Sequence, residues 1–179
     1  MSYENVTQQI IGEVLSFAPP TVIFGVGVPG SGKSTLLNEL GTQLSTKPVD
    51  VDNLRNRLMT TGWTAGAIDR LDHQIASEVS THIINGGVAI IDSTNCHAEF
   101  RQRDISLYRS LGARTIGAIW LDTPLEAAIA RDTSRDTRAR VGAQTVTSMH
   151  AALTSQEPSV PEGFDWVFRV TDESLSASA

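Results

Sequence analysis

The sequence contains little cysteine and no long hydrophobic run. Cys96 is the only cysteine among 179 residues, so an internal disulfide is excluded and a reducing compartment is the default. No apolar run approaches the length that spans a membrane. The first residues carry Glu4 and Glu13 and lack the basic segment of a signal peptide. We therefore expect a cytoplasmic protein with no membrane contact and no disulfide-linked partner.

Positive charge is also scarce. The net charge is −6 at pH 7, which disfavours broad, non-specific binding to long nucleic acids. Only Lys33 and Lys47 are lysines; the other basic residues are arginines, which suit planar, bidentate contacts with phosphate. The four histidines are scattered without metal-ligand spacing, so no structural metal is expected. Length and a hydrophobic content of 40% indicate one globular domain over residues 1–179.

The clearest motif lies in residues 21–37. An apolar, β-branched run predicts a buried strand, and the full phosphate-loop pattern Gly27-x-x-x-x-Gly32-Lys33-Ser34 follows it. Glycines let backbone N–H groups turn inward, where they and the helix N-terminus bind phosphate oxygens. Lys33 is expected at the β- and γ-phosphates and the Ser34 hydroxyl at Mg²⁺. The predicted nucleotide-binding residues of this segment are Gly27, Pro29, Gly30, Ser31, Gly32, Lys33, Ser34 and Thr35.

The same segment permits a second interpretation. Gly25-x-Gly27-x-x-Gly30 fits a dinucleotide fingerprint, and Asp50 lies at about the right distance downstream for a ribose contact. That interpretation does not need the residues from Gly32 to Thr35 and gives no reason for Pro29 in the turn. A nucleoside triphosphate is therefore favoured, and the dinucleotide stays as an alternative.

A carboxylate and an arginine follow the next predicted strand, at 48–51. We expect a helix over 52–59, with Asp52 as its N-cap in the plain structural interpretation. Arg55 would lie in the first turn, where the helix dipole disfavours a cation, and a local rule broken in this way often marks a functional site. Asp52 and Arg55 are three residues apart and share one helix face. They suggest a carboxylate beside an anion-binding guanidinium.

Polar residues also follow a buried strand predicted at 88–92. Asp92 ends this strand as in a Walker B element, which holds Mg²⁺ or its waters. Ser93, Thr94 and Asn95 then form a polar turn at the carboxyl end of the strand, where open α/β sheets bind ligands. In the helix predicted at 98–111, the arginines are expected on a solvated face; they are Arg101, Arg103 and Arg109.

Residues 131–140 contain four arginines among small polar residues. We interpret about 131–141 as a mobile lid that brings Arg135 onto the transferred phosphoryl group, with Arg131 also at the donor nucleotide. The structural alternative is a solvated loop whose arginines pair locally with Asp132 and Asp136.

Predicted strands at 21–27, 48–51, 88–92, 114–121 and 166–170 alternate with helices. This pattern indicates an α/β fold of three layers, with a central parallel sheet of about five strands, helices on both faces and an arginine-rich lid. We expect the helix at 124–131 to have Thr123 as N-cap, and the tail at 171–179 to be frayed. No Asn-Lys-x-Asp motif occurs, which disfavours a GTPase.

Four segments in this order and spacing resemble the kinase domain of the bacteriophage polynucleotide 5′-kinases: GVPGSGKST at 27–35, Asp52-x-x-Arg55, the Asp92–Asn95 turn and the arginine-rich segment. The resemblance covers nearly the whole chain. It implies an adenylate-kinase-like P-loop fold, ATP and Mg²⁺, and a location in the cytoplasm, or the host cytoplasm if the chain is phage-encoded.

The resemblance also implies residue roles. Asp52 would be the general base that deprotonates the acceptor 5′-hydroxyl, and Arg55 would bind the acceptor's 3′-phosphate. Lys33 and Ser34 would hold the triphosphate and Mg²⁺, and Asp92 would help to place the metal. Arg135 would contact the donor phosphates. Thr94 and Asn95 are assigned to the acceptor site.

Several alternatives remain open. Asp50 lies two residues before Asp52, so either carboxylate could be the base. The chain has no Asp-x-Asp-Gly-Thr motif, so 3′-phosphatase activity is not expected. A small-molecule kinase acting on a nucleoside, a sugar acid or a sugar nucleotide would use the same fold. A non-catalytic nucleotide-binding module is the alternative of another class, and it would retain Asp52 only as a helix cap.

Overall fold

The computed structural model describes residues 4–58 and 64–172. Its centre is a five-stranded sheet in the order β2-β3-β1-β4-β5, in which every neighbouring pair is parallel. The strands are β1 (Thr21–Val26), β2 (Val49–Asp50), β3 (Val88–Asp92), β4 (Thr115–Asp122) and β5 (Trp166–Thr171). The described helices are α1 (Glu4–Leu15), α2 (Lys33–Gln43), α3 (Val51–Leu58), α4 (Ala65–Ile84), α5 (Ala98–Ser110), α6 (Leu125–Thr133) and α7 (Ala143–Ser155). The predicted α/β class and parallel sheet are confirmed.

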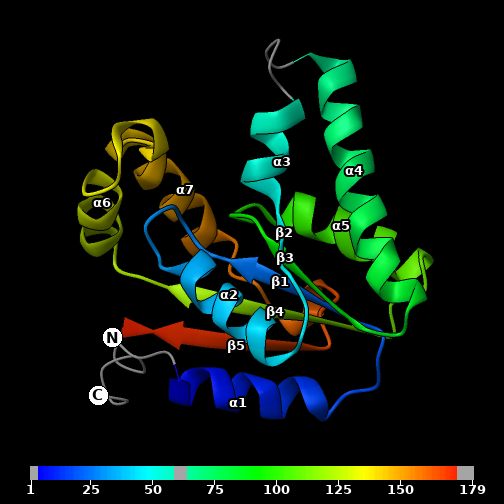
Figure 1. Ribbon diagram of the computed structural model, residues 1–179. Helices are drawn as coiled ribbons and strands as arrows, with labels where there is room; N and C mark the ends of the chain where they lie inside the picture. Colours follow the sequence, from blue (N-terminus) through cyan, green and yellow to red (C-terminus); the bar gives the residue numbers. More distant parts are fainter. Residues whose placement is uncertain (1–3, 59–63, 173–179) are drawn as a thin grey trace.

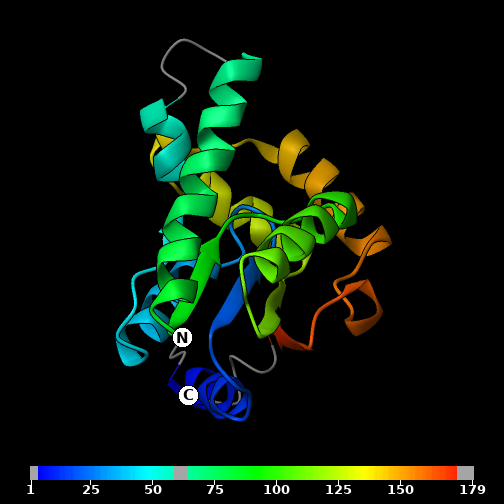
Figure 2. The same cartoon turned by 90° about the vertical axis from the view of Figure 1, so that its right-hand side faces the viewer.

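Helices cover both faces of the sheet, and they bury its central strand on both sides. Side chains alternate between the faces of a strand. On β1, Ile23 packs into one cluster with residues of α1 and α2, whereas Val22 and Phe24 pack into a second cluster with residues of α4, α5 and α7. Figure 2 shows α1 below the sheet and α4, α5 and α7 on its other side. The three predicted layers are therefore present.

The strand order places a ligand crevice at the carboxyl end of β1. The chain passes from β1 to β2 and β3 on one side of it and then crosses to β4 and β5 on the other. Such a reversal opens a crevice outside the carboxyl ends of the strands. In Figure 1, α3 and α4 lie to one side of the carboxyl end of β1, and α6 and α7 lie to the other. The register pairs Gly25 with Asp92, so the phosphate loop starts beside the end of β3.

Local boundaries differ from prediction at two helix starts. Helix α3 begins at Val51, and its cap is Asp50, whose carboxylate accepts the Asn53 N–H at 2.9 Å. The prediction of Asp52 as N-cap is wrong, and Arg55 lies in the last turn of α3, where the dipole favours a cation. At α6, Pro124 occupies the N-cap position instead of Thr123. The Thr123 hydroxyl donates to the Ser31 carbonyl at 3.3 Å and so helps to hold the phosphate loop.

One further expectation, the start of the frayed tail, changes. Thr171 belongs to β5, and Asp172 pairs with Arg131 at 3.2 Å, so the predicted frayed tail does not begin at 171. Residues 173–179 lie outside the described part of the chain.

None of the helices within 4–58 and 64–172 combines the length and hydrophobicity that a bilayer crossing requires.

The prediction of a solvated Arg101 is wrong, because this side chain is fully buried. Its Nε donates to Glu162 at 2.8 Å, and its terminal nitrogens donate to the carbonyls of Asn95 at 2.9 Å and Gln156 at 2.6 Å. Glu162 is also buried. These bonds join the turn after β3 to the segment that precedes β5. Local sequence could not reveal them because Glu162 lies 61 residues from Arg101.

We expect Arg101→Met to lower the free energy of unfolding by about 3–5 kcal/mol, because it leaves the buried Glu162 carboxylate without its partner. Urea titration followed by circular dichroism measures the loss. Arg114→Met, at an exposed position, is the matched control and should change stability by less than about 0.5 kcal/mol. Adding Glu162→Leu to Arg101→Met should restore part of the stability. Equal midpoints for Arg101→Met and wild type would contradict the structural role.

Candidate functional site

The phosphate loop has the backbone geometry that its glycines permit. Gly30 has φ +85°, and a Cβ there would lie 2.2 Å from the Ala128 carbonyl oxygen of α6. Gly32 has φ +90° and occupies the N-cap position of α2 without a side-chain cap. Side chains are strained or excluded at both positions, so the loop curls tightly under the start of α2. The uncapped helix N-terminus suits an anion.

A cavity of about 120 Å³ lies over this loop. Besides the loop it is bordered by α3, by the turn after β3 and by the segment between α6 and α7. Its lining residues are Val28, Pro29, Gly30, Ser31, Gly32, Lys33, Ser34, Thr35, Asp52, Thr94, Arg135, Ala139 and Val141. We call it the donor cavity. The structure thus brings Asp52 and Arg135, which are far apart in sequence, to the predicted phosphate-binding residues.

Two observations show that this cavity suits phosphate and a divalent cation. The Ser31 hydroxyl is buried and has no hydrogen-bond partner within residues 4–58 and 64–172. Lys33 and Asp92, both nearly buried, form an ion pair with Nζ 3.0 Å from Oδ1. A buried pair in this place supplies a cation for phosphate oxygens and a carboxylate for a hard metal. Ser34, the other predicted metal ligand, lines the same cavity.

The ion pair between Asp52 and Arg55 joins two cavities. Asp52 lines the donor cavity, whereas Arg55 lines a second cavity of about 300 Å³ between α3, α4, α5 and the end of β3. We call the second one the acceptor cavity. Asp50 lines neither of them: it caps α3 and borders a separate cavity with Lys47 and Arg57. Of the two carboxylates only Asp52 lines the donor cavity, so Asp50 is not placed there for the ribose contact of the dinucleotide interpretation. The assignment of Asp52 as the base stays a prediction.

The turn after β3 is fastened to the phosphate loop. The Gly27 N–H donates to the Thr94 carbonyl at 3.0 Å, and the Asn95 side chain donates to the Gly25 carbonyl at 2.8 Å. Asn95 has φ +49°, an uncommon conformation that these bonds stabilise. Thr94 lines both cavities, and Asn95 lines the acceptor cavity. The predicted polar turn thus forms the border between the donor cavity and the acceptor cavity.

The arginine-rich segment is anchored by a buried acid. Asp132 is 2% exposed and accepts the N–H groups of Val141 at 3.2 Å and Gly142 at 3.0 Å. The Arg135 guanidinium lies 3.7 Å from the same carboxylate while it faces the donor cavity. The expected local ion pair with Asp132 is therefore present, and Arg135 also lines the donor cavity. The mobile lid that brings Arg135 onto the transferred phosphoryl group stays a prediction.

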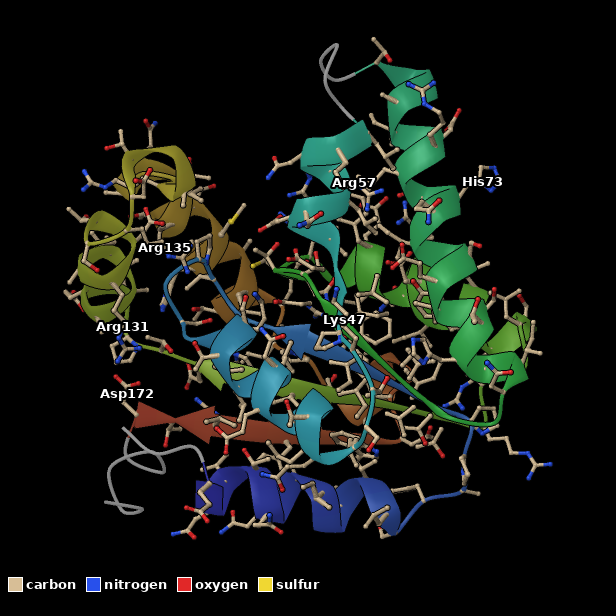
Figure 3. All side chains as sticks on the ribbon, in the orientation of Figure 1. Lys47, Arg57, His73, Arg131, Arg135 and Asp172 are labelled. Carbon is tan, nitrogen blue, oxygen red and sulfur yellow. The ribbon has the colours of Figure 1, made fainter. Side chains whose placement is uncertain are left out.

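Arg131 does not line the donor cavity. It belongs to α6 and pairs with Asp172 at the end of β5 (Figure 3). Arg135 follows the end of α6 and lies near the phosphate loop (Figure 3). Of the two lid arginines predicted at the donor nucleotide, the structure brings only Arg135 to the phosphate-binding residues.

The acceptor cavity contains residues that sequence reasoning missed. From α4 come Ile68, Asp72 and Ile75, and from α5 come Phe100, Arg103, Asp104 and Tyr108. Ile68 is 40% exposed. The sequence does show apolar and charged residues spaced along two helices. That spacing identifies a shared cavity only once α4 is known to pack beside α5.

Burial shifts several pKa values in this cavity. Desolvation raises the pKa of the Asp104 carboxyl, although its pairing with Arg103 opposes the shift. Burial likewise raises the pKa of the Tyr108 hydroxyl and of the Cys96 thiol. The inner part of the acceptor cavity is therefore a poorly solvated environment with fixed hydrogen-bonding groups.

Comparison with known proteins agrees with this geometry. The AAA domain family matches residues 22–156. The chain belongs to this family. A search of curated proteins gives no match.

Solved structures show the same fold at low sequence identity. A chain of the Pnkp1/Rnl/Hen1 RNA repair complex aligns with a TM-score of 0.64 at 23% identity over 79% of this chain; the alignment spans 46% of that longer chain. A sugar kinase from Janibacter sp. HTCC2649 aligns with a TM-score of 0.62 at 16% identity, over 89% of this chain and 92% of its own. A gluconokinase from Sinorhizobium meliloti 1021 gives 0.57 at 16%, over 85% and 82%. This chain thus has the P-loop kinase fold, which it shares with the sugar kinase and the gluconokinase.

We expect Cys96 to react slowly with a thiol-specific disulfide reagent at pH 8. It is 3% exposed, and its raised pKa lowers the thiolate fraction below that of a free cysteine at the same pH. The rate should rise as the pH approaches the raised pKa and should become fast after denaturation. Because Cys96 lines the acceptor cavity, a bound acceptor should slow the reaction further. A native-state rate equal to that of a free thiol would contradict this assignment.

Proposed function

We propose that this protein is an ATP-dependent kinase that transfers the γ-phosphate to the 5′-hydroxyl of a polynucleotide or oligonucleotide. The observation that carries the proposal is the Asp52–Arg55 ion pair, whose carboxylate faces the phosphate-loop cavity and whose guanidinium faces the neighbouring cavity. A hydroxyl beside Asp52 would thereby lie next to the donor phosphates, and an anionic group of the same acceptor would reach Arg55. Fold likeness to a chain of an RNA repair complex is consistent with this assignment.

The chemistry follows from the positions of these side chains. Asp52 accepts the proton of the attacking hydroxyl, so that the oxygen becomes a better nucleophile. Lys33 and Arg135 neutralise the charge that spreads over the transferred phosphoryl oxygens. Arg55 binds the 3′-phosphate of the terminal acceptor nucleotide and holds the Asp52 carboxylate in place.

ATP and Mg²⁺ fit the residues present. The backbone of residues 27–35, the unpartnered Ser31 hydroxyl and Lys33 would hold the triphosphate, and Ser34 and Asp92 would hold the metal. Bound Mg²⁺ supplies charge neutralisation at the phosphate oxygens. As phosphate arrives, Lys33 would exchange its Asp92 partner for phosphate oxygens, which frees Asp92 for the metal.

A small-molecule kinase is the second candidate. Sugar kinases share the fold over nearly their whole length, and an acidic chain offers long nucleic acids little general attraction. The two candidates share the donor cavity and the base, and they differ in the group that occupies the acceptor cavity.

We predict that Asp52→Asn lowers kcat for transfer of labelled γ-phosphate from ATP to a 5′-hydroxyl oligonucleotide by about 10²- to 10⁴-fold, because the amide cannot take the proton. Asp50→Asn is a matched control: it is the same isosteric change two residues away, and asparagine still caps a helix. Its activity should stay near that of wild type. Loss of activity in Asp50→Asn alone would transfer the base role to Asp50. ATP binding without transfer to any acceptor would favour a binding module.

We also predict that Arg55→Ala raises KM for a nucleoside 3′-monophosphate by about 10- to 100-fold, because a charge-assisted hydrogen bond to the phosphate is lost. KM for the corresponding nucleoside without the 3′-phosphate should change much less. Arg57→Ala, on the same helix but at a different cavity, is the control and should leave both values near wild type. Equal effects of Arg55→Ala on both acceptors would contradict a 3′-phosphate contact.

A further inference from the structure

We propose that the acceptor cavity is a nucleobase site in which Phe100 of α5 and Ile68 of α4 hold the flat ring of the acceptor's terminal base. This proposal rests on the function proposed above and identifies the residues that would select an aromatic acceptor. It concerns a part of the cavity that neither Asp52 nor Arg55 explains.

The first observation is the exposure of two large apolar side chains at one cavity. Phe100 is 51% exposed and Ile68 is 40% exposed, and both line the acceptor cavity from different helices. Binding of an apolar ligand to such a surface is favourable, because it removes exposed apolar area from water. A nucleobase offers two such faces, whereas a sugar acid offers hydroxyl and carboxylate groups.

The second observation is the way in which Phe100 is held. The His97 ring contacts it edge-on, with centroids 5.8 Å apart and an interplanar angle of 85°. The Arg103 guanidinium carbon lies 5.7 Å from the Phe100 ring centroid. These two contacts restrict the orientations open to the Phe100 ring, and a restricted ring loses less conformational entropy on stacking.

The third observation is a group of charged side chains on the wall of the cavity, of which Arg103 and Asp72 are 54% and 45% exposed. Arg103 donates to Asp104 at 2.8 Å and reaches Asp72 across the groove between α4 and α5 at 3.4 Å. This cluster contains guanidinium donors and carboxylate acceptors at one place. The edge of any base carries acceptors, donors or both, so each base would find partners. We therefore infer stacking that tolerates different bases instead of recognition of a single base.

The fourth observation is the position of Arg55 and Thr94 in the same cavity. One nucleotide can then place its base between Phe100 and Ile68, its 3′-phosphate at Arg55 and its 5′-hydroxyl toward Asp52. The cavity of about 300 Å³ would receive the base and sugar of a single nucleotide. The structure thus assigns acceptor selection to residues of α4 and α5 that lie away from the phosphate loop.

The test compares two acceptors that differ in the base: thymidine 3′-monophosphate and the abasic 1,2-dideoxyribose 3-phosphate, in which hydrogen replaces the base and the 5-hydroxyl stays free. KM and kcat for γ-phosphate transfer from ATP are measured for wild type, Phe100→Ala, Phe100→Leu and Phe100→Tyr. The Leu variant keeps an apolar side chain and removes the ring, and the Tyr variant keeps the ring. Leu111→Ala removes a comparably exposed apolar side chain at the end of the same helix, outside the cavity.

We expect wild type to bind the nucleotide at least about tenfold better than the abasic acceptor, from the usual strength of base stacking. Phe100→Ala should raise KM for the nucleotide by about tenfold and leave KM for the abasic acceptor nearly unchanged. Phe100→Leu should lie between, and Phe100→Tyr and Leu111→Ala should match wild type. Equal changes for both acceptors in Phe100→Ala, or none for either, would overturn the base site while transfer to nucleotides still supports the kinase. If wild type phosphorylates only sugar acids, the proposed function fails, and the base site fails with it.

Discussion

The hydrogen bond from the Gly27 N–H to the Thr94 carbonyl, at 3.0 Å, fastens the phosphate loop to the turn that follows β3. The parallel pairing of β1 with β3 makes it possible, because it ends both strands at the same edge of the sheet. Asn95 adds a second bond to the Gly25 carbonyl, and Arg101 holds the Asn95 carbonyl from inside the protein. The positions of the donor and acceptor cavities both depend on this junction, since Thr94 borders each of them.

Two buried ion pairs differ in what they offer. Arg101 and Glu162 satisfy each other within a network that includes two backbone carbonyls, so the pair stabilises one arrangement of the chain. Lys33 lines the donor cavity, and its partner Asp92 is not among the lining residues, so a phosphate in this cavity would meet the Lys33 ammonium. A buried charge is costly only while it has no partner of opposite charge. The Lys33–Asp92 pair therefore suits a site that binds charged ligands.

The fold is shared with a sugar kinase, a gluconokinase and a chain of an RNA repair complex, so the fold does not by itself identify the acceptor. In this chain the acceptor cavity is lined by Arg55, by two exposed apolar side chains and by a group of charged side chains on α4 and α5. The net charge of −6 disfavours broad, non-specific attraction of a long nucleic acid.

Short-range sequence patterns were sufficient for the strands, the phosphate loop, the polar turn after β3 and the Asp52–Arg55 pair. Each depends on residues close in sequence, such as an apolar run followed by glycines or two side chains three positions apart on a helix. The cap of α3 is also a local contact, from the Asn53 N–H to Asp50, but the pattern alone did not separate Asp50 from Asp52 as its acceptor. Tertiary packing decided that Arg101 is buried against Glu162, and that Arg131 pairs with Asp172 while Arg135 lines the donor cavity. It also brought Phe100 and Ile68 to one cavity, because they lie on two different helices and no local periodicity encodes that the helices share a cavity.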